Sequence, residues 1–179
     1  MRIALALCLL PRLAAADAVA VTARTREPVQ SWFTIGATTT PDASAYGVRL
    51  QSDWLAGTAW SGGLFLSVLQ RGEQVMGVGV PQASGGLFVA HSNAIAGPVW
   101  LRGQLGVGGA ISAHATESSV IAGGSVTSTS LVGEAALFVS VDMGDRFALV
   151  GGPIVQVADT PAPGYGTNTL TVFVGLQHR

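Results

Sequence analysis

Hydrophobic and polar residues alternate along most of this chain with the period of two that is typical of β-strands. The segment VWLRGQLGVGGAIS, residues 99–112, shows the alternation plainly. Arg102 and Gln104 take even positions in it, and the large apolar side chains take odd ones, namely Val99, Leu101, Leu105, Val107 and Ile111. Since successive side chains of a strand point to opposite faces, the segment predicts a strand with one apolar and one polar face. Gly106 and Gly108 fall on the polar side and indicate that this side has little room.

Eight segments of this kind are expected between residue 30 and residue 178. Their ranges are 30–39, 44–55, 58–69, a fourth that ends near residue 93, 99–112, 129–141, 146–157 and 167–178. The 24 glycines and the shortage of helix-forming runs favour strands over helices. Residues 75–81, VMGVGVP, leave one alternative open, because a separate strand there would lead to ten strands instead of eight.

The connections between these segments differ in length. The second, fourth and sixth contain the short runs AGT, AIAGP and MGD, whereas the others tend to be longer and more polar. We expect the three longest at about residues 70–85, 113–130 and 158–168. Alternate connections of an up-and-down sheet lie on the same rim, so this pattern predicts short turns at one end and long loops at the other.

The composition indicates that something other than water covers the apolar face. Hydrophobic residues make up 49% of the chain and charged residues 11%, and the mean hydropathy is +0.48. A membrane-spanning helix needs roughly 20 consecutive apolar residues, but the longest uncharged stretch, residues 74–101, is broken by Pro81, Pro98 and the pair Gly85-Gly86. A closed barrel is the other structure that satisfies every backbone group in lipid. We therefore predict an all-β fold, an eight-stranded antiparallel up-and-down transmembrane β-barrel.

The first eighteen residues have the features of a secretory signal peptide. Arg2 supplies a positive start, IALALCLL an apolar run, and Ala16-Asp17-Ala18 a cleavage site with small residues. We expect a signal peptide at 1–18, an N-terminal periplasmic segment at 19–28 and the barrel at 29–179. Cys8, the single cysteine, lies in the signal, so the mature chain is expected to contain no disulfide.

The charge of the mature chain argues against one class of partner. Without residues 1–18 the chain has seven arginines, nine acidic residues and no lysine. We therefore expect no basic surface for nucleic acid. No glycine cluster fits the dinucleotide-binding or P-loop patterns, so we expect no nucleotide and no cofactor.

Six polar residues share the parity that faces away from the predicted lipid surface. They are Arg49, Gln51, Asp53, Arg102, Gln104 and Glu134. An arginine on the lipid face near the membrane midplane would cost about 2–4 kcal/mol, whereas inside the barrel Arg102 can form bidentate bonds with Glu134 or Asp53. We predict a polar cluster that plugs the lumen, with a polar conduit or ligand site as the alternative.

Two tryptophans are predicted to lie in an aromatic girdle at the membrane interface. Trp54 closes the second segment and Trp60 opens the third, next to a short connection. An indole ring favours this depth because it meets both hydrocarbon and polar headgroups. Strict alternation turns the other two, Trp32 and Trp100, inward.

These features together resemble a known family. The signal, the eight alternating segments and the unequal rims resemble the small eight-stranded outer-membrane barrels of the OmpA/OmpX/OmpW type. The final segment LTVFVGLQHR is similar to the family's terminal insertion strand, with Gly175 as its glycine, although His178 stands where an aromatic residue is common. The resemblance implies a monomer in the bacterial outer membrane that contacts outer-membrane lipid and the barrel-assembly machinery, and long loops that can bind an extracellular ligand.

The candidate chemistry does not indicate an enzyme. His91, His114 and His178 form neither a metal set nor a catalytic set, so no catalytic and no metal site is predicted. AHSNA, residues 90–94, resembles the H-x-S-N pattern of outer-membrane lipid A deacylases, but neighbouring His91 and Ser92 would point to opposite faces of a strand. We expect a structural or surface-interacting barrel, or one that passes small solutes. A lipid-modifying enzyme and a secreted soluble barrel that binds an apolar ligand are the alternatives.

Overall fold

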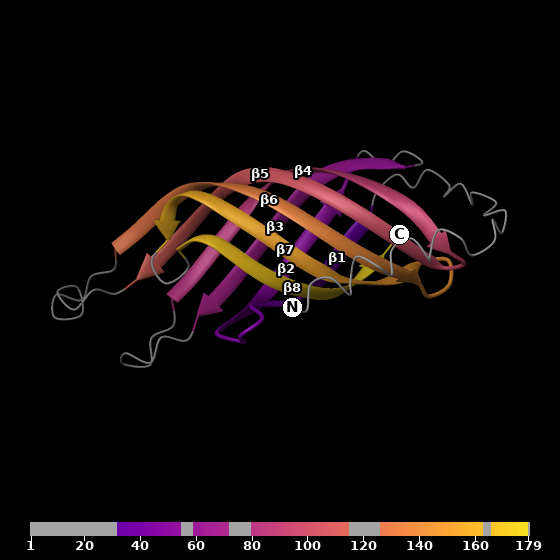
Figure 1. The fold of residues 1–179 in the computed structure, drawn as a ribbon, viewed down its shortest axis with the longest axis horizontal. Helices are drawn as coiled ribbons and strands as arrows, with labels where there is room; N and C mark the ends of the chain where they lie inside the picture. The colour runs from indigo at the N-terminus through magenta and orange to yellow at the C-terminus, as the bar shows by residue number, and fades with distance from the viewer. Residues whose placement is uncertain (1–31, 55–58, 72–79, 115–125, 163–165, 179) are drawn as a thin grey trace, which may run out of the picture.

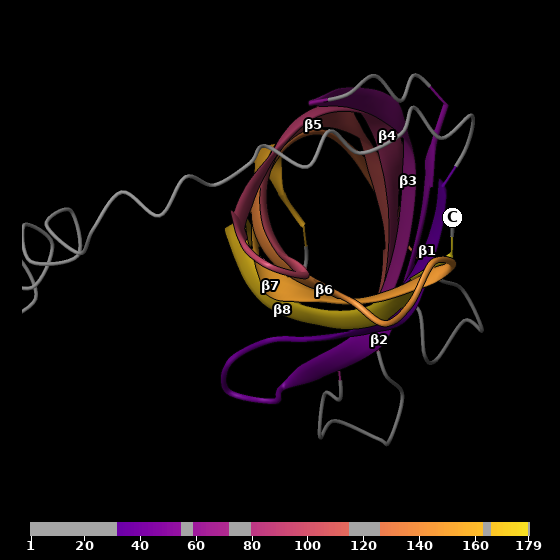
Figure 2. The same ribbon diagram turned by 90° about the vertical axis from the view of Figure 1, so that its right-hand side faces the viewer.

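The computed structural model describes residues 32–54, 59–71, 80–114, 126–162 and 166–178, which form eight strands in a closed barrel. The strands are β1 (Trp32–Thr39), β2 (Ala45–Asp53), β3 (Trp60–Arg71), β4 (Val80–Ala96), β5 (Val99–His114), β6 (Val126–Asp142), β7 (Phe147–Ala162) and β8 (Gly166–His178). Each strand is antiparallel to its neighbours in sequence, and β8 pairs with β1 to close the sheet (Figure 1, Figure 2). The prediction of eight strands is confirmed. The predicted signal peptide and the segment 19–28 lie outside the described residues.

The alternation of the sequence separates the two faces of the barrel. On β5, for example, Leu105 and Val107 point outward, each 64% exposed, while Gln104 is buried inside. The same division holds on β6, where Leu137 is exposed and Glu134 and Phe138 are buried. The outside of the barrel is therefore apolar and its inside contains most of the buried polar groups. Within the described ranges, no helix is long and apolar enough to cross a membrane.

The strands differ in length, and this corrects the predicted loops. β1 to β3 have 8, 9 and 12 residues, whereas β4 to β7 have 16 or 17. The strands include residues 70–71, 80–85, 113–114, 126–128, 158–162 and 166, all of which were assigned to loops. Backbone pairing needs no apolar side chains, so the strands continue after the hydrophobic pattern has ended. The remaining parts of the three predicted loops, 72–79, 115–125 and 163–165, lie outside the described residues.

The short connections are tight turns in which glycine is needed. Gly97 and Gly144 have positive φ angles of 52° and 82°, which residues with a Cβ rarely adopt. Gly97 joins β4 to β5, and Gly144 lies between β6 and β7, where the backbone N–H of Met143 donates to the Phe147 carbonyl at 2.8 Å. These turns place the ends of β4, β5, β6 and β7 on one rim.

Pro153 lies inside β7, a position that would normally disturb a sheet because proline has no N–H to donate. β6 and β7 pair on either side of it, at Ala136 with Ile154 and again at Val139 with Gly151. The local loss of pairing is thus limited to a short stretch, and the strand continues in register.

The first connection, residues 40–44, is held by a carboxylate. The backbone N–H of Ser44 donates to Asp42 Oδ1 at 3.1 Å, and the Ser44 hydroxyl donates to the same oxygen at 2.8 Å. Hydrogen bonds from the side chain of Thr40 and then from Ser44 lower the pKa of Asp42 from 3.8 to about 2. The carboxylate thus orders a turn that contains a non-glycine residue with positive φ, Ala43.

We expect the Ser44 amide signal to titrate with a midpoint near pH 2, which NMR of the protein in micelles can measure. Because the folded-state pKa is depressed, the stabilisation of the turn is fully present above about pH 4 and is lost as the pH falls through the folded value near 2. In Asp42→Asn this titration should disappear while the barrel signals stay in place. A pH midpoint close to 3.8 for the Ser44 amide signal would contradict the hydrogen bonds to Asp42.

The glycines of β5 have different structural roles on its inner and outer faces. A Cβ built on Gly108, which points inward, would collide with the backbone carbonyl oxygen of Gly85 on β4. A Cβ on the outward-pointing Gly103 would meet no atom within 4 Å. Gly106, also inward, leaves space for the ring of Phe65, whose Cε1 would lie 3.1 Å from such a Cβ. The predicted lack of room on the inner side therefore arises from a neighbouring strand as much as from side chains.

Gly108→Ala should destabilise the barrel by about 1–3 kcal/mol, because β4 and β5 must separate to admit the methyl group. Gly103→Ala should leave the free energy of unfolding within about 0.5 kcal/mol of the wild type. Urea unfolding of the protein in lipid vesicles, followed by tryptophan fluorescence, measures both. Equal effects of the two substitutions would show that the close approach at Gly108 is unimportant.

Candidate functional site

Two ion pairs cross the interior of the barrel. Arg49 on β2 donates to both carboxylate oxygens of Glu134 on β6, at 2.9 and 2.5 Å. Arg102 on β5 donates to both oxygens of Asp53 on β2, at 2.7 and 2.9 Å. β2 and β6 are four strands apart in either direction, so the first pair joins opposite walls. The side chains of Arg49 and Glu134 are 1% and 0% exposed, which makes this a buried pair with bidentate geometry.

Two glutamine amides connect the two ion pairs, and a third joins Glu134 to a serine. The Gln51 amide donates to Gln104 Oε1 at 3.0 Å, and more weakly to Asp53 at 3.5 Å, while the Gln104 amide donates to Glu134 at 3.3 Å. The third amide, Gln156 on β7, donates to Glu134 at 3.0 Å and to Ser84 on β4 at 3.3 Å. The structure thus brings all six residues of the predicted lumen cluster into one network, which we call the lumen network: Arg49, Gln51, Asp53, Arg102, Gln104 and Glu134, with Gln156 and Ser84 in addition.

Aromatic rings face the two guanidinium groups. The Arg49 guanidinium carbon lies 4.7 Å from the centroid of the Phe65 ring. That of Arg102 lies 5.3 Å from Phe88 and 6.0 Å from Trp32. Rings at these distances attract a cation electrostatically and also exclude water from it. The lumen network therefore contains two positive and two negative charges in an environment with little solvent.

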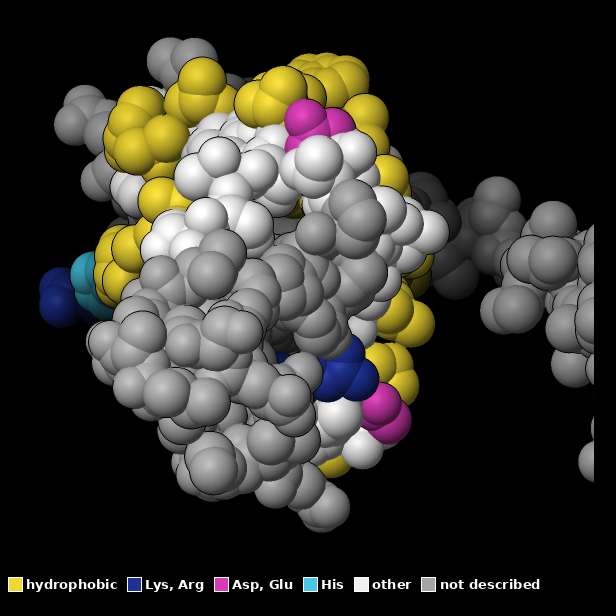
Figure 3. Space-filling model, turned by 90° about the vertical axis from the view of Figure 1, so that its left-hand side faces the viewer, with side chains coloured by type: hydrophobic (Ala, Val, Ile, Leu, Met, Phe, Trp, Pro, Cys, Tyr) yellow, Lys and Arg dark blue, Asp and Glu magenta, His cyan; other side chains and the backbone are white. Residues whose placement is uncertain are grey.

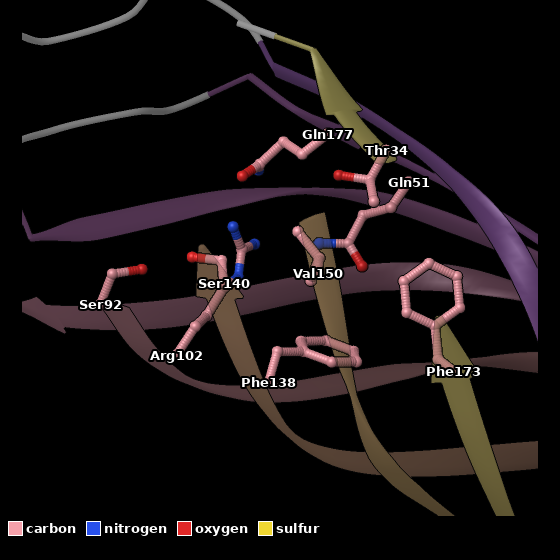
Figure 4. Close-up of a pocket in the computed structure, with 9 residues that line it drawn as sticks. All are labelled: Thr34, Gln51, Ser92, Arg102, Phe138, Ser140, Val150, Phe173 and Gln177. Carbon is pink, nitrogen blue, oxygen red and sulfur yellow. The ribbon is translucent and has the colours of Figure 1, made fainter. Parts of the chain in front are cut away.

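Apolar side chains occupy the other side of the interior. Ala136, Phe138, Ala148, Val150, Ile154 and Phe173, all from β6, β7 and β8, form one cluster. The rings of Phe138 and Phe173 meet edge to face, with centroids 5.7 Å apart. These residues and the lumen network leave between them a cavity of about 10 Å³, lined by Arg102, Gln51, Ser92 and Ser140 among others (Figure 4). A space of this volume holds about one water molecule.

Two members of the lumen network were missed by sequence reasoning. Gln156 occupies the same inward face of β7 as Ile154 and Val150, because the three lie an even number of residues apart. The parity argument that identified Gln104 would therefore have identified Gln156. Ser84 falls in a region that was assigned to a loop. The signal for Gln156 was present in the predicted strand 146–157, whereas Ser84 could be found only if the fourth strand was extended correctly.

The four tryptophans divide between the two faces. Trp54 and Trp60 point outward, 53% and 61% exposed, whereas Trp32 and Trp100 are buried. The Trp100 indole N–H donates to Asp142 at 2.9 Å, near the start of a short turn. Two further aromatic residues, Phe33 and Phe147, are exposed at the same end of the barrel and were not predicted. A view from the other end shows hydrophobic side chains around the circumference (Figure 3).

The histidines lie apart from the lumen network. The ring of His91 contacts Trp60 edge to face at 4.6 Å, and that of His178 contacts Phe147 at 5.0 Å. Ser92, next to His91, lines the interior cavity, so the two side chains lie on opposite faces of β4. The side chain of His114 is outside the described part of the structure. Among the side chains that are described, no group of three or more His, Cys, Asp or Glu residues is placed to hold a metal ion.

No protein-family model matches this sequence, and no curated protein sequence matches it either. Solved structures do resemble the fold. Neisserial surface protein A superposes with a TM-score of 0.61 at 11% identity, covering 83% of this chain and 94% of that one. Ail, the attachment invasion locus protein of Yersinia pestis, superposes with a TM-score of 0.57 at 14% identity, covering 83% and 96%. The N-terminal β-barrel domain of Pseudomonas aeruginosa OprF superposes with a TM-score of 0.56 at 11% identity, covering 83% and 96%. This chain has the fold of the small eight-stranded outer-membrane barrels.

Glu134→Gln should lower the free energy of unfolding by about 3–5 kcal/mol, because it leaves the Arg49 guanidinium buried without a counter-charge. The double variant Arg49→Met with Glu134→Gln should recover most of that loss, since both charges are then absent. Urea unfolding of the wild type, the two single variants and the double variant gives the coupling energy. Strictly additive losses would show that the two side chains do not stabilise each other.

Proposed function

We propose that this chain is an integral β-barrel of the bacterial outer membrane with a structural or surface-interacting role and a lumen plugged by the lumen network. The observation that carries the proposal is the reversed distribution of side chains. Leucine, valine and isoleucine cover the outside of a closed barrel, while two ion pairs and five glutamines are buried inside. In water such a surface would be costly, whereas in hydrocarbon it is the favourable solution.

The lengths of the strands suit this location. A tilted transmembrane strand needs roughly 9–11 residues, and β4 and β6 have 17 each. On β6 and on β7, which has 16 residues, the surplus residues lie at the end opposite the short turns, where outward positions are polar, as at Thr127, Thr129 and Asp159. The Asp159 carboxylate accepts the Leu131 backbone N–H at 2.9 Å there. The apolar band thus ends before the strands do, and the barrel walls extend beyond the membrane.

The same distribution argues against the soluble alternative. A secreted barrel that carries an apolar ligand needs an apolar lumen and a polar outside. Here the interior cavity has a volume of about 10 Å³ and is lined in part by Arg102 and Gln51. That volume is far below the roughly 300 Å³ at which small-molecule pockets begin.

The proposal does not include catalysis. The lipid A deacylase reading needs His91 to activate Ser92, but the two lie on opposite sides of the barrel wall. The names of two structural neighbours, a surface protein and an attachment and invasion protein, support a surface role instead. Binding of an extracellular ligand through the long connections stays a prediction, because residues 72–79, 115–125 and 163–165 lie outside the described ranges.

The arrangement of the charges supports the proposal of a plugged lumen. Water or ions that pass along the barrel would have to displace the bidentate pairs Arg49–Glu134 and Arg102–Asp53, which reach across it. Separating a buried pair leaves two charges without compensation, and the cost is several kcal/mol. Passage of small solutes therefore requires a conformational change of the lumen network.

The protein refolded in micelles should migrate faster on a denaturing gel before boiling than after it, and it should stay with the membrane fraction on washing at high pH. In planar bilayers the wild type should show no resolved channel, while a variant that lacks both ion pairs, Arg49→Ser and Glu134→Ser with Arg102→Ser and Asp53→Ser, should conduct. A protein that is monomeric in buffer without detergent would refute the membrane location. Steady channels in the wild type would instead leave the membrane location standing and refute the plug.

A further inference from the structure

The outer face of the barrel contains a groove near the rim of the short turns. It has a volume of about 490 Å³, which falls within the roughly 300–1,000 Å³ typical of ligand sites. Its body is lined by Val89, Gly103, Leu105, Ala135, Leu137 and Pro153, from β4 to β7. Among the described residues no carboxylate and no arginine lines it. The groove is therefore an apolar hollow in the outer surface of the barrel.

The hollow exists because small residues on one strand are paired with larger residues on the neighbouring strands. Gly103 pairs with His91 on one side and Leu137 on the other, and Ala135 pairs with Leu105. The glycine is not needed by the backbone, because its φ is not in the positive range and a Cβ would meet nothing within 4 Å. At Gly108 the missing side chain makes room for a neighbouring strand. At Gly103 the space above the glycine is open to the surroundings of the barrel.

Two residues whose side chains carry N–H groups border one end of the groove. His91 and Trp60 line it there, and they pair with each other across β3 and β4. The Asn93 amide nitrogen lies 3.2 Å from His91 Nδ1. An amide nitrogen can only donate, so the tautomer of His91 that satisfies this contact is the one with its proton on Nε2. His91 Nε2–H and the Trp60 indole N–H are then two donors beside an apolar hollow, at the depth where the aromatic side chains place the membrane interface.

The geometry points to a binding site for one phospholipid of the leaflet on the short-turn side, and this inference depends on the membrane location proposed above. One acyl chain lies in the groove over Gly103, and the phosphate oxygens accept hydrogen bonds from His91 and Trp60. An apolar body with donors at one end matches the chemistry of a phospholipid. A second copy of the barrel is a poorer occupant, because its convex wall cannot reach a floor that lies below Leu105 and Leu137.

The test uses the full protein refolded into vesicles of phosphatidylethanolamine and phosphatidylglycerol, extracted in mild detergent and measured by native mass spectrometry. The wild type should retain one phospholipid per chain. Gly103→Phe, which fills the groove, should lower the retained fraction at least fivefold. Gly133→Phe is the matched control, because Gly133 also points outward but lies outside the groove, and a Cβ there makes an ordinary 3.9 Å contact with the Val157 carbonyl oxygen. It should retain the lipid.

A second pair of variants tests the end of the groove that carries the N–H groups. His91→Gln keeps an N–H donor and should retain phospholipid, whereas His91→Leu removes the donor and should lower retention severalfold. Gel mobility before and after boiling checks that every variant has folded.

The outcomes separate the two proposals. A wild type that inserts and folds but retains no phospholipid overturns the lipid site alone, as do equal losses in Gly103→Phe and Gly133→Phe. A dimer that Gly103→Phe abolishes would identify a second copy as the occupant and also overturn it. Failure of the wild type to insert into vesicles would instead refute the membrane location.

Discussion

The compensation of four buried charges is the constraint on which the rest of this barrel depends. Arg49 and Arg102 lie inside a narrow lumen, and each finds its carboxylate on a distant strand of the wall. A guanidinium group that lost its partner there would keep its charge, because arginine does not deprotonate in proteins. The pairing is thus possible only in the closed barrel, where strands that are far apart in sequence face each other across a short distance. Closure and charge compensation require one another.

Glycines occur on the inside and on the outside of the barrel for different physical reasons. On the inner side, Gly108 is required because strands β4 and β5 approach each other closely. On the outer side, Gly103 is compatible with a side chain but lacks one, and the surface is hollow there. A glycine-rich composition thus has two separate causes in this molecule. One belongs to the packing of the sheet and the other to its contact with the surroundings.

Much of the architecture could be predicted because a strand's alternation is a local property. The assignment of Arg102 and Gln104 to one face and Leu105 and Val107 to the other needed only the period of two. The same argument placed Trp32 and Trp100 inside and Trp54 and Trp60 outside, as the structure has them. It failed at the ends of β4, β6 and β7, where polar residues continue to pair although the hydrophobic signal has stopped. Hydrogen bonding of the backbone leaves little trace in the choice of side chains, so loops were assigned to residues that are strands.

The sequence by itself determined the central part of each strand, the face of its side chains and the kind of residue that the lumen contains, and it favoured eight strands with ten as the alternative. Only the tertiary structure decided which partners meet. Arg102 had two carboxylates of suitable parity, Asp53 and Glu134, and it pairs with Asp53 while Arg49 pairs with Glu134. The choice depends on the register of eight strands around a closed circle, and each register depends on those before it. The face to which a side chain points is determined locally, by its position relative to neighbouring residues of the strand. Its contacts across the lumen are determined only when the barrel has closed.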